Sequence, residues 1–205
     1  MIYMISGGFG VPGSGKSLWL GHLAKRALAG KPLYAGRYSL QSKPGMKYDR
    51  VYTNFAFPGA YILDFDTLGH CDYHDCCMLI DEIMMYADSR DFKTFSKELK
   101  WFFSQHRKQN IDIVWISQQY DDVDKKIRGL TQNYYYIRQS FIPGFSEILP
   151  IEAFFDIPST RIESGQQFSR IIDRGFFFRP SLYKLINSFE CIGHWPSAPA
   201  PSEKW

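Results

Sequence analysis

The sequence predicts a three-layer α/β fold with a mainly parallel central sheet and a small C-terminal extension. Short apolar runs alternate with segments of helical periodicity over residues 1–140, which is the pattern of helices that cover both faces of a parallel sheet. The run Cys76–Ile80 is continuously apolar and stops at Asp81, as expected for a strand that is buried on both faces. A length of 205 residues suits one domain with an extension better than two full domains.

The expected elements can be placed in order along the chain. A first strand over Ile2–Ile5 ends in glycines, a helix over Leu18–Leu28 stops at Gly30, and residues 31–48 form a loop rich in Gly, Pro, Ser and Lys. Later strands are expected at Val51–Phe55, Ile62–Phe65, Cys76–Ile80, Ile111–Ile116 and Tyr134–Ile137. A further helix running to about Lys108 is predicted from the spacing of Phe92, Phe95, Leu99, Phe102 and Phe103.

The periodicity weakens after Pro143. Two apolar segments, Phe176–Phe178 and Tyr183–Ile192, are expected as edge strands or as a small appendage, and the Pro-rich run 196–201 as a flexible linker or tail. We therefore expect a core domain over residues 1–140, an extension packed on it over residues 141–195, and a flexible tail over residues 196–205.

Composition excludes several classes of protein. With 45% hydrophobic residues the chain can build a core and is not disordered. It has no run of about 18 or more apolar residues, so no transmembrane helix is expected within it. Adjacent Cys76 and Cys77 do not suit a secreted disulfide framework, which indicates a reducing cytoplasm. A net charge of +3 permits a nucleic-acid partner without implying one.

Residues 10–17 match the phosphate-binding pattern G-x-x-x-x-G-K-[ST] in full. Small residues let successive backbone N–H groups point at phosphate oxygens, Lys16 reaches the β- and γ-phosphates, and Ser17 is placed to ligate Mg²⁺. The predicted nucleotide-binding residues are Gly10, Pro12, Gly13, Ser14, Gly15, Lys16, Ser17 and Leu18. Because Ser6-Gly7-Gly8-Phe9 separates the expected strand from this P-loop, either the strand continues through Phe9 or the loop entry carries an insertion.

A second acidic motif indicates hydrolysis of the bound nucleotide. Asp81 ends a buried strand and can hold Mg²⁺, and Glu82 can orient or deprotonate a water in line with the γ-phosphate. In ATPases with such a pair, a further strand usually lies between the two motif strands. Ser117 or Gln118, at the end of Ile111–Ile116, could then contact the phosphate or the water, or could be an ordinary polar strand end.

Arginines can complete such a site from a neighbouring subunit. Arg128, with Arg107 as a rival, could stabilise charge on the γ-phosphate if the chain forms a homo-oligomeric ring, or either could lie on a solvated helix face. The predicted catalytic set is thus Lys16, Asp81, Glu82, Gln118 and Arg128, with Ser17 and Asp81 as metal ligands.

Two other groups of residues favour plain structural roles. The cluster His70, Cys71, His74, Cys76 and Cys77 suggests zinc, but part of it enters a buried strand and it lacks a C-x-x-C pair, so packing is the preferred explanation. A basic stripe for DNA could be formed by Lys93, Lys97, Lys100, Arg107 and Lys108. Their helical spacing makes a solvated face the default.

Taken together, these residues resemble the zonula occludens toxin (Zot) family, the assembly ATPases of filamentous phages within the FtsK–HerA-like class of P-loop motors. The matching pieces are Ile2-Tyr3, Tyr52-Thr53-Asn54, Ile80-Asp81-Glu82, His106-Arg107-Lys108, Asp112-Ile113, Ser117-Gln118 and Asp124 through Ile127-Arg128. A weaker match runs from Tyr183-Lys184-Leu185 to Ser188-Phe189-Glu190. The resemblance covers most of residues 1–140.

The resemblance implies an oligomeric ATPase that drives virion assembly and extrusion from the cytoplasmic face of the host inner membrane. Its implied partners are ATP rather than GTP, phage assembly proteins and host inner-membrane proteins. Family members usually carry a membrane span after the ATPase domain, so here either the chain is a truncated domain or another protein supplies the anchor. Two alternatives stay open: a DNA-translocating or genome-packaging ATPase, and a nucleotide-gated scaffold with negligible turnover.

Overall fold

A computed structural model describes residues 4–41, 46–88, 96–153 and 169–186. The strands of the main sheet are β1 (Ile5–Phe9), β4 (Arg50–Thr53), β5 (Tyr61–Ile62), β6 (Cys76–Ile80), β7 (Ile111–Ser117), β8 (Asn133–Gln139), β9 (Phe145–Ala153), β10 (Ser169–Ile171) and β11 (Gly175–Phe178). The main helices are α1 (Lys16–Leu28), α2 (Lys97–Gln105) and α3 (Lys125–Leu130). Short elements fill the connections: β2 (Tyr34–Ala35), β3 (Tyr38–Ser39) and the 3₁₀ turns η1 (Phe65–Thr67), η2 (Ile83–Met85) and η3 (Arg179–Leu182).

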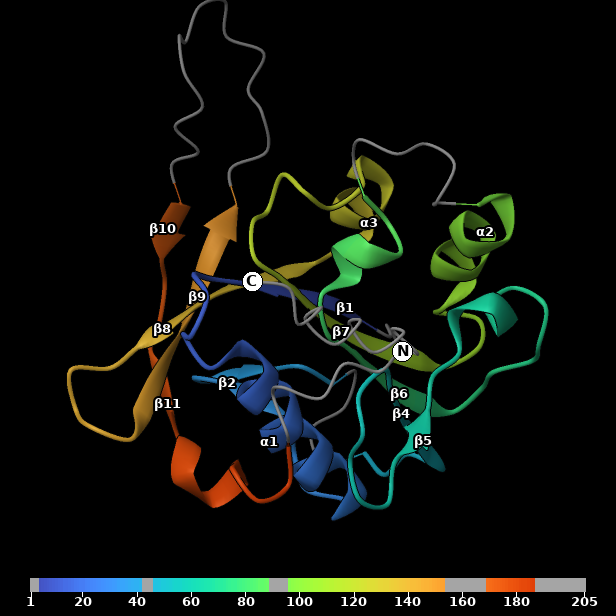
Figure 1. The fold of residues 1–205 in the computed structure, drawn as a ribbon. Coiled ribbons are helices and arrows are strands. Elements are labelled where there is room, and N and C mark those ends of the chain that lie inside the picture. The colour runs from blue at the N-terminus through green and yellow to red at the C-terminus, as the bar shows by residue number, and fades with distance from the viewer. Residues whose placement is uncertain (1–3, 42–45, 89–95, 154–168, 187–205) are drawn as a thin grey trace, which may run out of the picture.

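The sheet order is β10-β9-β8-β1-β7-β6-β4-β5, and β11 also pairs with β9 (Figure 1). The strands from β8 to β5 in this order all run parallel, whereas β9, β10 and β11 are joined by antiparallel pairing. A mainly parallel α/β fold is thus confirmed. The strand β7 lies between β1 and β6, which is the inserted strand that the acidic motif predicts.

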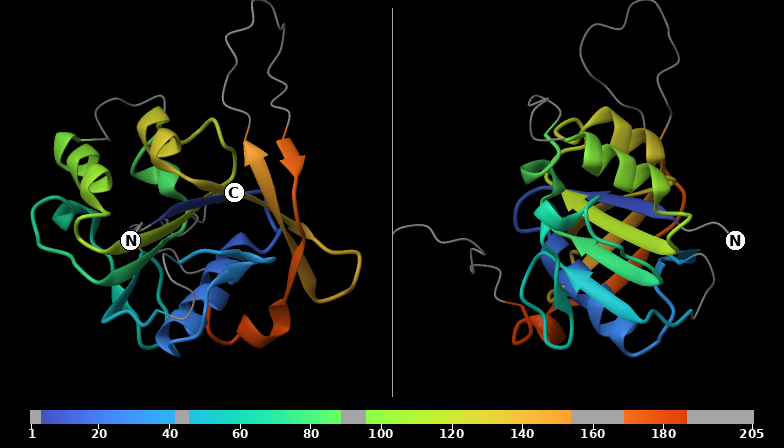
Figure 2. Two further views of the ribbon diagram at one scale, coloured as in Figure 1. Left: turned by 180° about the vertical axis from the view of Figure 1, so that it is seen from behind. Right: turned by 90° about the vertical axis from the view of Figure 1, so that its right-hand side faces the viewer.

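Helices cover both faces of the sheet, which makes three layers (Figure 2). Along β6, Cys77 and Leu79 pack into the cluster that contains the apolar side of α1. Cys76, Met78 and Ile80 pack into the other cluster, with residues of α2 and α3. All five side chains of β6 are fully buried, as the apolar run predicts, because each face of the strand meets a helical layer.

The first strand occupies Ile5–Phe9 rather than ending at Ile5. Residues 1–3 of the predicted strand lie outside the described part of the chain. The glycines in β1 accommodate a bulky neighbour: a Cβ built on Gly7 would lie 2.3 Å from the ring of Trp115, which is fully buried on β7. The strand therefore continues through Phe9 into the P-loop, and no insertion is needed.

The chain after Pro143 differs most from expectation. It forms β9, which pairs in register with β8 along six residue pairs, so the extension continues the main sheet. The edge strand predicted at Phe176–Phe178 is present as β11. For Tyr183–Ile192 the sequence predicts an edge strand or a small appendage, and the described residues 183–186 form no strand. They follow the 3₁₀ turn η3, and Leu182 and Ile186 pack in the core cluster that contains α1. Residues 187–205, with the predicted tail, lie outside the described part.

Other elements differ in detail. The predicted loop 31–48 contains the small β2–β3 ribbon, and the strand at Ile62–Phe65 is reduced to β5 followed by η1. The helix α2 begins after Ser96, whose hydroxyl accepts a hydrogen bond from Leu99 N at 3.2 Å, and it ends at Gln105. Phe92 and Phe95 lie outside the described residues. The domain boundary near residue 140 stays a prediction.

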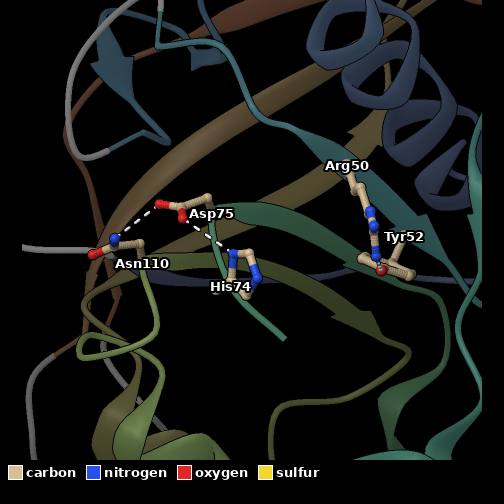
Figure 3. Close-up of polar contacts among 5 residues, drawn as sticks. All are labelled: Arg50, Tyr52, His74, Asp75 and Asn110. Atoms are coloured by element: carbon tan, nitrogen blue, oxygen red, sulfur yellow. Dashed lines mark hydrogen bonds and ion pairs between the residues drawn. The ribbon is translucent and has the colours of Figure 1, made fainter. Parts of the chain in front are cut away.

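The amino-terminal ends of β6 and β7 are tied together by Asp75 (Figure 3). Its carboxylate accepts a hydrogen bond from Asn110 Nδ2 at 2.8 Å and lies 3.2 Å from His74 Nδ1. Asp75 and Asn110 have positive φ angles of 49° and 60°, which these two residue types tolerate better than most. On β4, Arg50 donates to the Tyr52 hydroxyl at 3.4 Å. These contacts organise the edge of the sheet opposite to the P-loop.

In the portion of the chain that the structure describes, none of the helices combines the length and apolar character needed to cross a bilayer.

Candidate nucleotide-binding site

The P-loop connects β1 to α1 at the carboxyl edge of the parallel strands. Its backbone needs glycine at three places. Gly13 and Gly15 have positive φ angles of 77° and 95°, and a Cβ built on Gly10 would lie 2.1 Å from the carbonyl oxygen of Ile137. The helix α1 begins at Lys16, so its N-terminus faces the loop. This geometry is that of a phosphate-binding loop at a helix N-terminus.

Lys16 is buried beneath the loop. Its Nζ donates to the carbonyl oxygens of Gly10 at 2.8 Å and Val11 at 3.2 Å. Burial lowers the pKa of Lys16, although the negative charges of Glu82 and Asp81 act in the opposite direction. The ammonium is therefore held inside the curve of the loop, near the carboxylates of Asp81 and Glu82 in the acidic motif.

Asp81 follows the last residue of β6 and faces the P-loop. Burial raises the pKa of Asp81, and the nearby Ser17 hydroxyl and the charge of Lys16 partly offset this effect. The Asp81 backbone is fixed by Asn54 at the end of β4. Asn54 Nδ2 donates to Asp81 O at 2.7 Å, and Asp81 N donates to Asn54 Oδ1 at 2.7 Å.

Glu82 has a left-handed backbone conformation, with φ 45° and ψ 57°. For a residue other than glycine, this conformation costs roughly 1–2 kcal/mol. Such strain at a strand end is typical of functional sites, where it directs a side chain. Burial and the neighbouring charge of Asp81 raise the pKa of Glu82. Both effects favour a carboxylate that can take up a proton at a higher pH than usual.

The end of β7 reaches the same place. Gln118 Nε2 donates to Glu82 Oε1 at 3.4 Å, and Ser117 is fully buried, with its hydroxyl lacking a recorded partner among the described residues. The structure thus brings Gln118, one of the two candidate sensor residues, beside Glu82, as the inserted position of β7 requires.

The donor set fits a magnesium ion. Asp81 Oδ1 and Glu82 Oε2 are buried oxygens with no hydrogen-bond partner among the described residues. The hydroxyl of Ser17 lies near enough to the Asp81 carboxylate to lower its pKa. Hydroxyl and carboxylate oxygens are hard ligands of the kind that Mg²⁺ takes in nucleotide sites, usually together with phosphate oxygens.

The two candidate arginines lie apart from this group. Arg128, on α3, contacts Asp121 at 2.9 Å and stacks over the ring of Tyr120, and its side chain is only 14% exposed. Arg107 is exposed in the turn that precedes β7. That turn lies at the amino-terminal edge of the parallel strands, whereas the P-loop lies at the carboxyl edge. Neither arginine has a recorded contact with the P-loop of its own chain.

Four residues near the P-loop were missed by sequence reasoning as site residues. Asn54 carries a signal that could have been used, because a polar residue ends a strand beside β6. Gln139, Ser146 and Arg179 belong to the end of β8 and to the antiparallel extension. Since β9 was not predicted, no sequence pattern placed these three side chains beside the loop.

The His–Cys cluster does not converge. Cys76 and Cys77 point into different core clusters on opposite faces of β6, and His74 contacts Asp75. No group of three or more potential metal-ligating His, Cys, Asp or Glu side chains occurs among residues 4–41, 46–88, 96–153 and 169–186. Of the basic stripe, Lys97, Arg107 and Lys108 are exposed, while Lys93 lies outside the described residues.

The fold and the geometry of this site define a P-loop NTPase of the three-layer α/β class. A family model described as zonular occludens toxin (Zot) matches residues 1–154, which is more than half of the chain. The chain therefore belongs to the Zot family, as its residues suggested.

One solved structure shares this fold, and a second is less similar. The N-terminal domain of zonular occludens toxin from Neisseria meningitidis is 19% identical, with a TM-score of 0.52, and the match covers 91% of this chain and 100% of that one. The genome packaging NTPase B204 of Sulfolobus turreted icosahedral virus 2, in complex with ATP-gammaS, is 10% identical with a TM-score of 0.49, over 72% of this chain and 92% of that one. No curated protein matches the sequence.

Proposed function

We propose that this chain is an Mg²⁺-dependent ATPase that drives the assembly and extrusion of filamentous phage virions at the host membrane. The observation that carries the enzymatic part is the conformation of Glu82, whose backbone is left-handed with φ 45° and whose carboxylate accepts a hydrogen bond from Gln118 Nε2 at 3.4 Å. Asp81 precedes it, and its buried Oδ1 has no hydrogen-bond partner among the described residues. A P-loop used only for binding would not need this second carboxylate in a strained conformation.

Binding would use the loop and the start of α1. The backbone N–H groups from Gly13 to Leu18 and the ammonium of Lys16 bind the phosphates, and the buried Leu18 side chain anchors the helix in the core. Ser17 and Asp81 would hold Mg²⁺. When bound, this ion neutralises charge on the β- and γ-phosphate oxygens.

Hydrolysis would use the group at the ends of β6 and β7. Glu82 orients the attacking water and accepts its proton at a carboxylate oxygen, and its raised pKa suits this role. Gln118, which donates to Glu82, orients that carboxylate and the water together. The left-handed backbone conformation of Glu82 sets the direction of its carboxylate before the nucleotide binds.

The biological role rests on membership of the Zot family. In this proposal the chain works as a homo-oligomeric ring at the cytoplasmic face of the inner membrane. Phage assembly proteins and host inner-membrane proteins are the expected partners. A neighbour's arginine, Arg107 or Arg128, would complete each site. The exposed Arg107 is sterically available, whereas Arg128 would first have to leave Asp121.

The test is phosphate release from ATP, measured over a series of protein concentrations with and without Mg²⁺. Turnover that rises steeply with concentration is expected for a ring with shared sites. Glu82→Gln should lower the rate by roughly 10²–10⁴-fold, the usual contribution of a general base. Lys16→Ala should abolish tight nucleotide binding. Unchanged turnover in both variants would overturn the mechanism.

The same assay with added DNA or vesicles tests the cargo. Stimulation by inner-membrane lipid vesicles supports the assembly role. Strong stimulation by duplex or single-stranded DNA, with steep salt dependence, would instead assign the chain to DNA translocation. Tight ATP binding without turnover at any concentration would contradict the enzymatic proposal and leave a nucleotide-gated scaffold.

A further inference from the structure

The antiparallel extension touches the P-loop directly. The hydroxyl of Ser146 on β9 is buried and donates to Ser14 O at 2.8 Å. At the end of β8, Gln139 Nε2 donates to Gly13 O at 2.9 Å. Two consecutive carbonyl groups of the loop are therefore held by side chains that lie more than a hundred residues away in sequence.

A third residue of the extension, Arg179, lies against the loop at Gly15. A Cβ built on Gly15 would be 3.3 Å from Arg179 Cδ and 2.7 Å from Ser146 Oγ. The Arg179 backbone is fixed, because its N–H donates to Gly144 O at 2.9 Å and Pro180 follows in the first turn of η3. The start of this side chain is thus held one residue before Lys16.

The guanidinium of Arg179 has unused hydrogen-bonding capacity. Its Nε is buried, and no acceptor for it is recorded among the described residues. A buried donor without a partner is unfavourable, and more so when it is charged. Arg138 on β8, by contrast, donates from Nε to Glu147 at 2.7 Å. Arg179 therefore carries a guanidinium beside a phosphate-binding loop, and no carboxylate partner for it is found among the described residues.

We propose that Arg179 binds the phosphate chain of the nucleotide held by the P-loop of its own chain. This inference rests on the proposed nucleotide-binding function. A guanidinium is planar and offers paired donors that match phosphate oxygens. The extension then forms one wall of the nucleotide site, and each bound nucleotide contacts a cationic side chain from the far end of the same polypeptide.

The experiment is equilibrium binding of Mg·ADP, followed by fluorescence of a labelled ADP, to the full chain and to four variants. Arg179→Met removes the charge and keeps a long side chain. Arg179→Lys keeps the charge and loses the planar fork. Arg174→Met is the matched control, because Arg174 is exposed in the same extension and lies roughly 16 Å away along β11 at about 3.3 Å per residue. Lys16→Ala marks binding at the P-loop.

Arg179→Met should weaken Mg·ADP binding by roughly 10- to 100-fold, since hydrogen bonds to charged groups contribute about 1.5–3 kcal/mol. Arg179→Lys should recover part of this loss, and Arg174→Met should bind as the parent does. The difference between parent and Arg179→Met should shrink as NaCl rises, because a charge interaction is screened. The unfolding temperature of Arg179→Met without nucleotide should be no lower than that of the parent, because the variant removes a buried donor that has no partner among the described residues.

Two results would overturn the inference while leaving nucleotide binding intact. In the first, Lys16→Ala loses binding but Arg179→Met binds like the parent. In the second, Arg179→Met loses affinity equally at all salt concentrations and unfolds at a lower temperature without nucleotide, which would show a structural role. If the parent binds no Mg·ADP, the proposed function itself fails and takes this inference with it.

Discussion

The pair of hydrogen bonds between Asn54 and the backbone of Asp81 predicts that Asn54→Ala damages both stability and metal use. Both bonds are 2.7 Å long and partly buried. Asn54 directly follows β4, and Asp81 directly follows the neighbouring strand β6. The amide therefore sets the direction in which the chain leaves β6, and with it the position of the Asp81 carboxylate.

The magnitude follows from the two bonds. Each contributes about 1 kcal/mol net, so Asn54→Ala should lower the free energy of unfolding by about 2 kcal/mol. For a chain of this length, that corresponds to a fall of roughly 4–8 °C in the unfolding temperature. Urea denaturation measures the stability. Phosphate release over a Mg²⁺ titration measures the second effect, which is a higher Mg²⁺ concentration for half-maximal rate.

The matched control is Thr53→Val. The Thr53 hydroxyl donates to Phe55 O at 2.7 Å at the same strand end, but it does not touch Asp81. This variant should lose about 1 kcal/mol of stability and keep the parent's Mg²⁺ requirement. The reasoning is refuted if Asn54→Ala unfolds at the parent's urea concentration, or if both variants shift the Mg²⁺ requirement equally.

Two further predictions concern the core and the acidic motif. Gly7→Ala places a Cβ 2.3 Å from the ring of fully buried Trp115, so it should lower the free energy of unfolding by about 1–3 kcal/mol or more. Urea denaturation measures this change, and a variant as stable as the parent would contradict the packing of β1 on β7. Burial raises the pKa of Glu82 in the folded protein above its ordinary value of 4.5. The folded protein therefore favours the neutral carboxyl. Its contribution to the free energy of unfolding is fully present below pH 4.5 and is lost as the pH rises through the raised pKa of the folded state. Glu82→Gln should therefore be more stable than the parent in urea at pH 7, with the difference vanishing at pH 4, and a difference independent of pH would contradict this.

The parallel half of the fold could be predicted because its sequence carries the signal that burial on both faces imposes. The run Cys76–Ile80 coincides with β6, and Ile111–Ile116 falls within β7. The helix α1 follows its apolar spacing closely. In each case the local sequence pattern matches the environment of the element in the fold, so the element can be predicted from its own segment of sequence.

The remaining elements depend on partners that lie elsewhere in the sequence. Glycines are poor strand formers, and Gly7 is accepted in β1 because a tryptophan from β7 takes the space of its side chain. In β9, Pro150 argues against a strand, yet it pairs opposite Tyr135 in the ladder with β8. Neither the place of Gly7 in β1 nor that of Pro150 in β9 can be predicted from the surrounding segment alone.

The residues of the candidate site also differ in whether they could be predicted from their own segment of sequence. Lys16, Ser17, Asp81 and Glu82 are encoded in two short motifs, since the chemistry fixes both the residue types and their spacing. Ser146 and Arg179 belong to no motif, because each reaches the P-loop only through the pairing of β9 and β11 with the rest of the sheet. Sequence reasoning could therefore name the residues of the two motifs, but not the side chains that the antiparallel strands bring to the loop.

The antiparallel extension is best understood as part of the nucleotide site. Phosphate binding needs the loop carbonyls to point away from the anion, and Gln139 and Ser146 hold two of them by donating hydrogen bonds. Both donors come from the β8–β9 hairpin, so a movement of this hairpin would change the shape of the loop. Conversely, a phosphate that draws Arg179 toward the loop would pull on β11 and η3, which pack against α1. If the chain acts as the proposed ATPase, the extension would therefore link the state of the bound nucleotide to the position of a surface element.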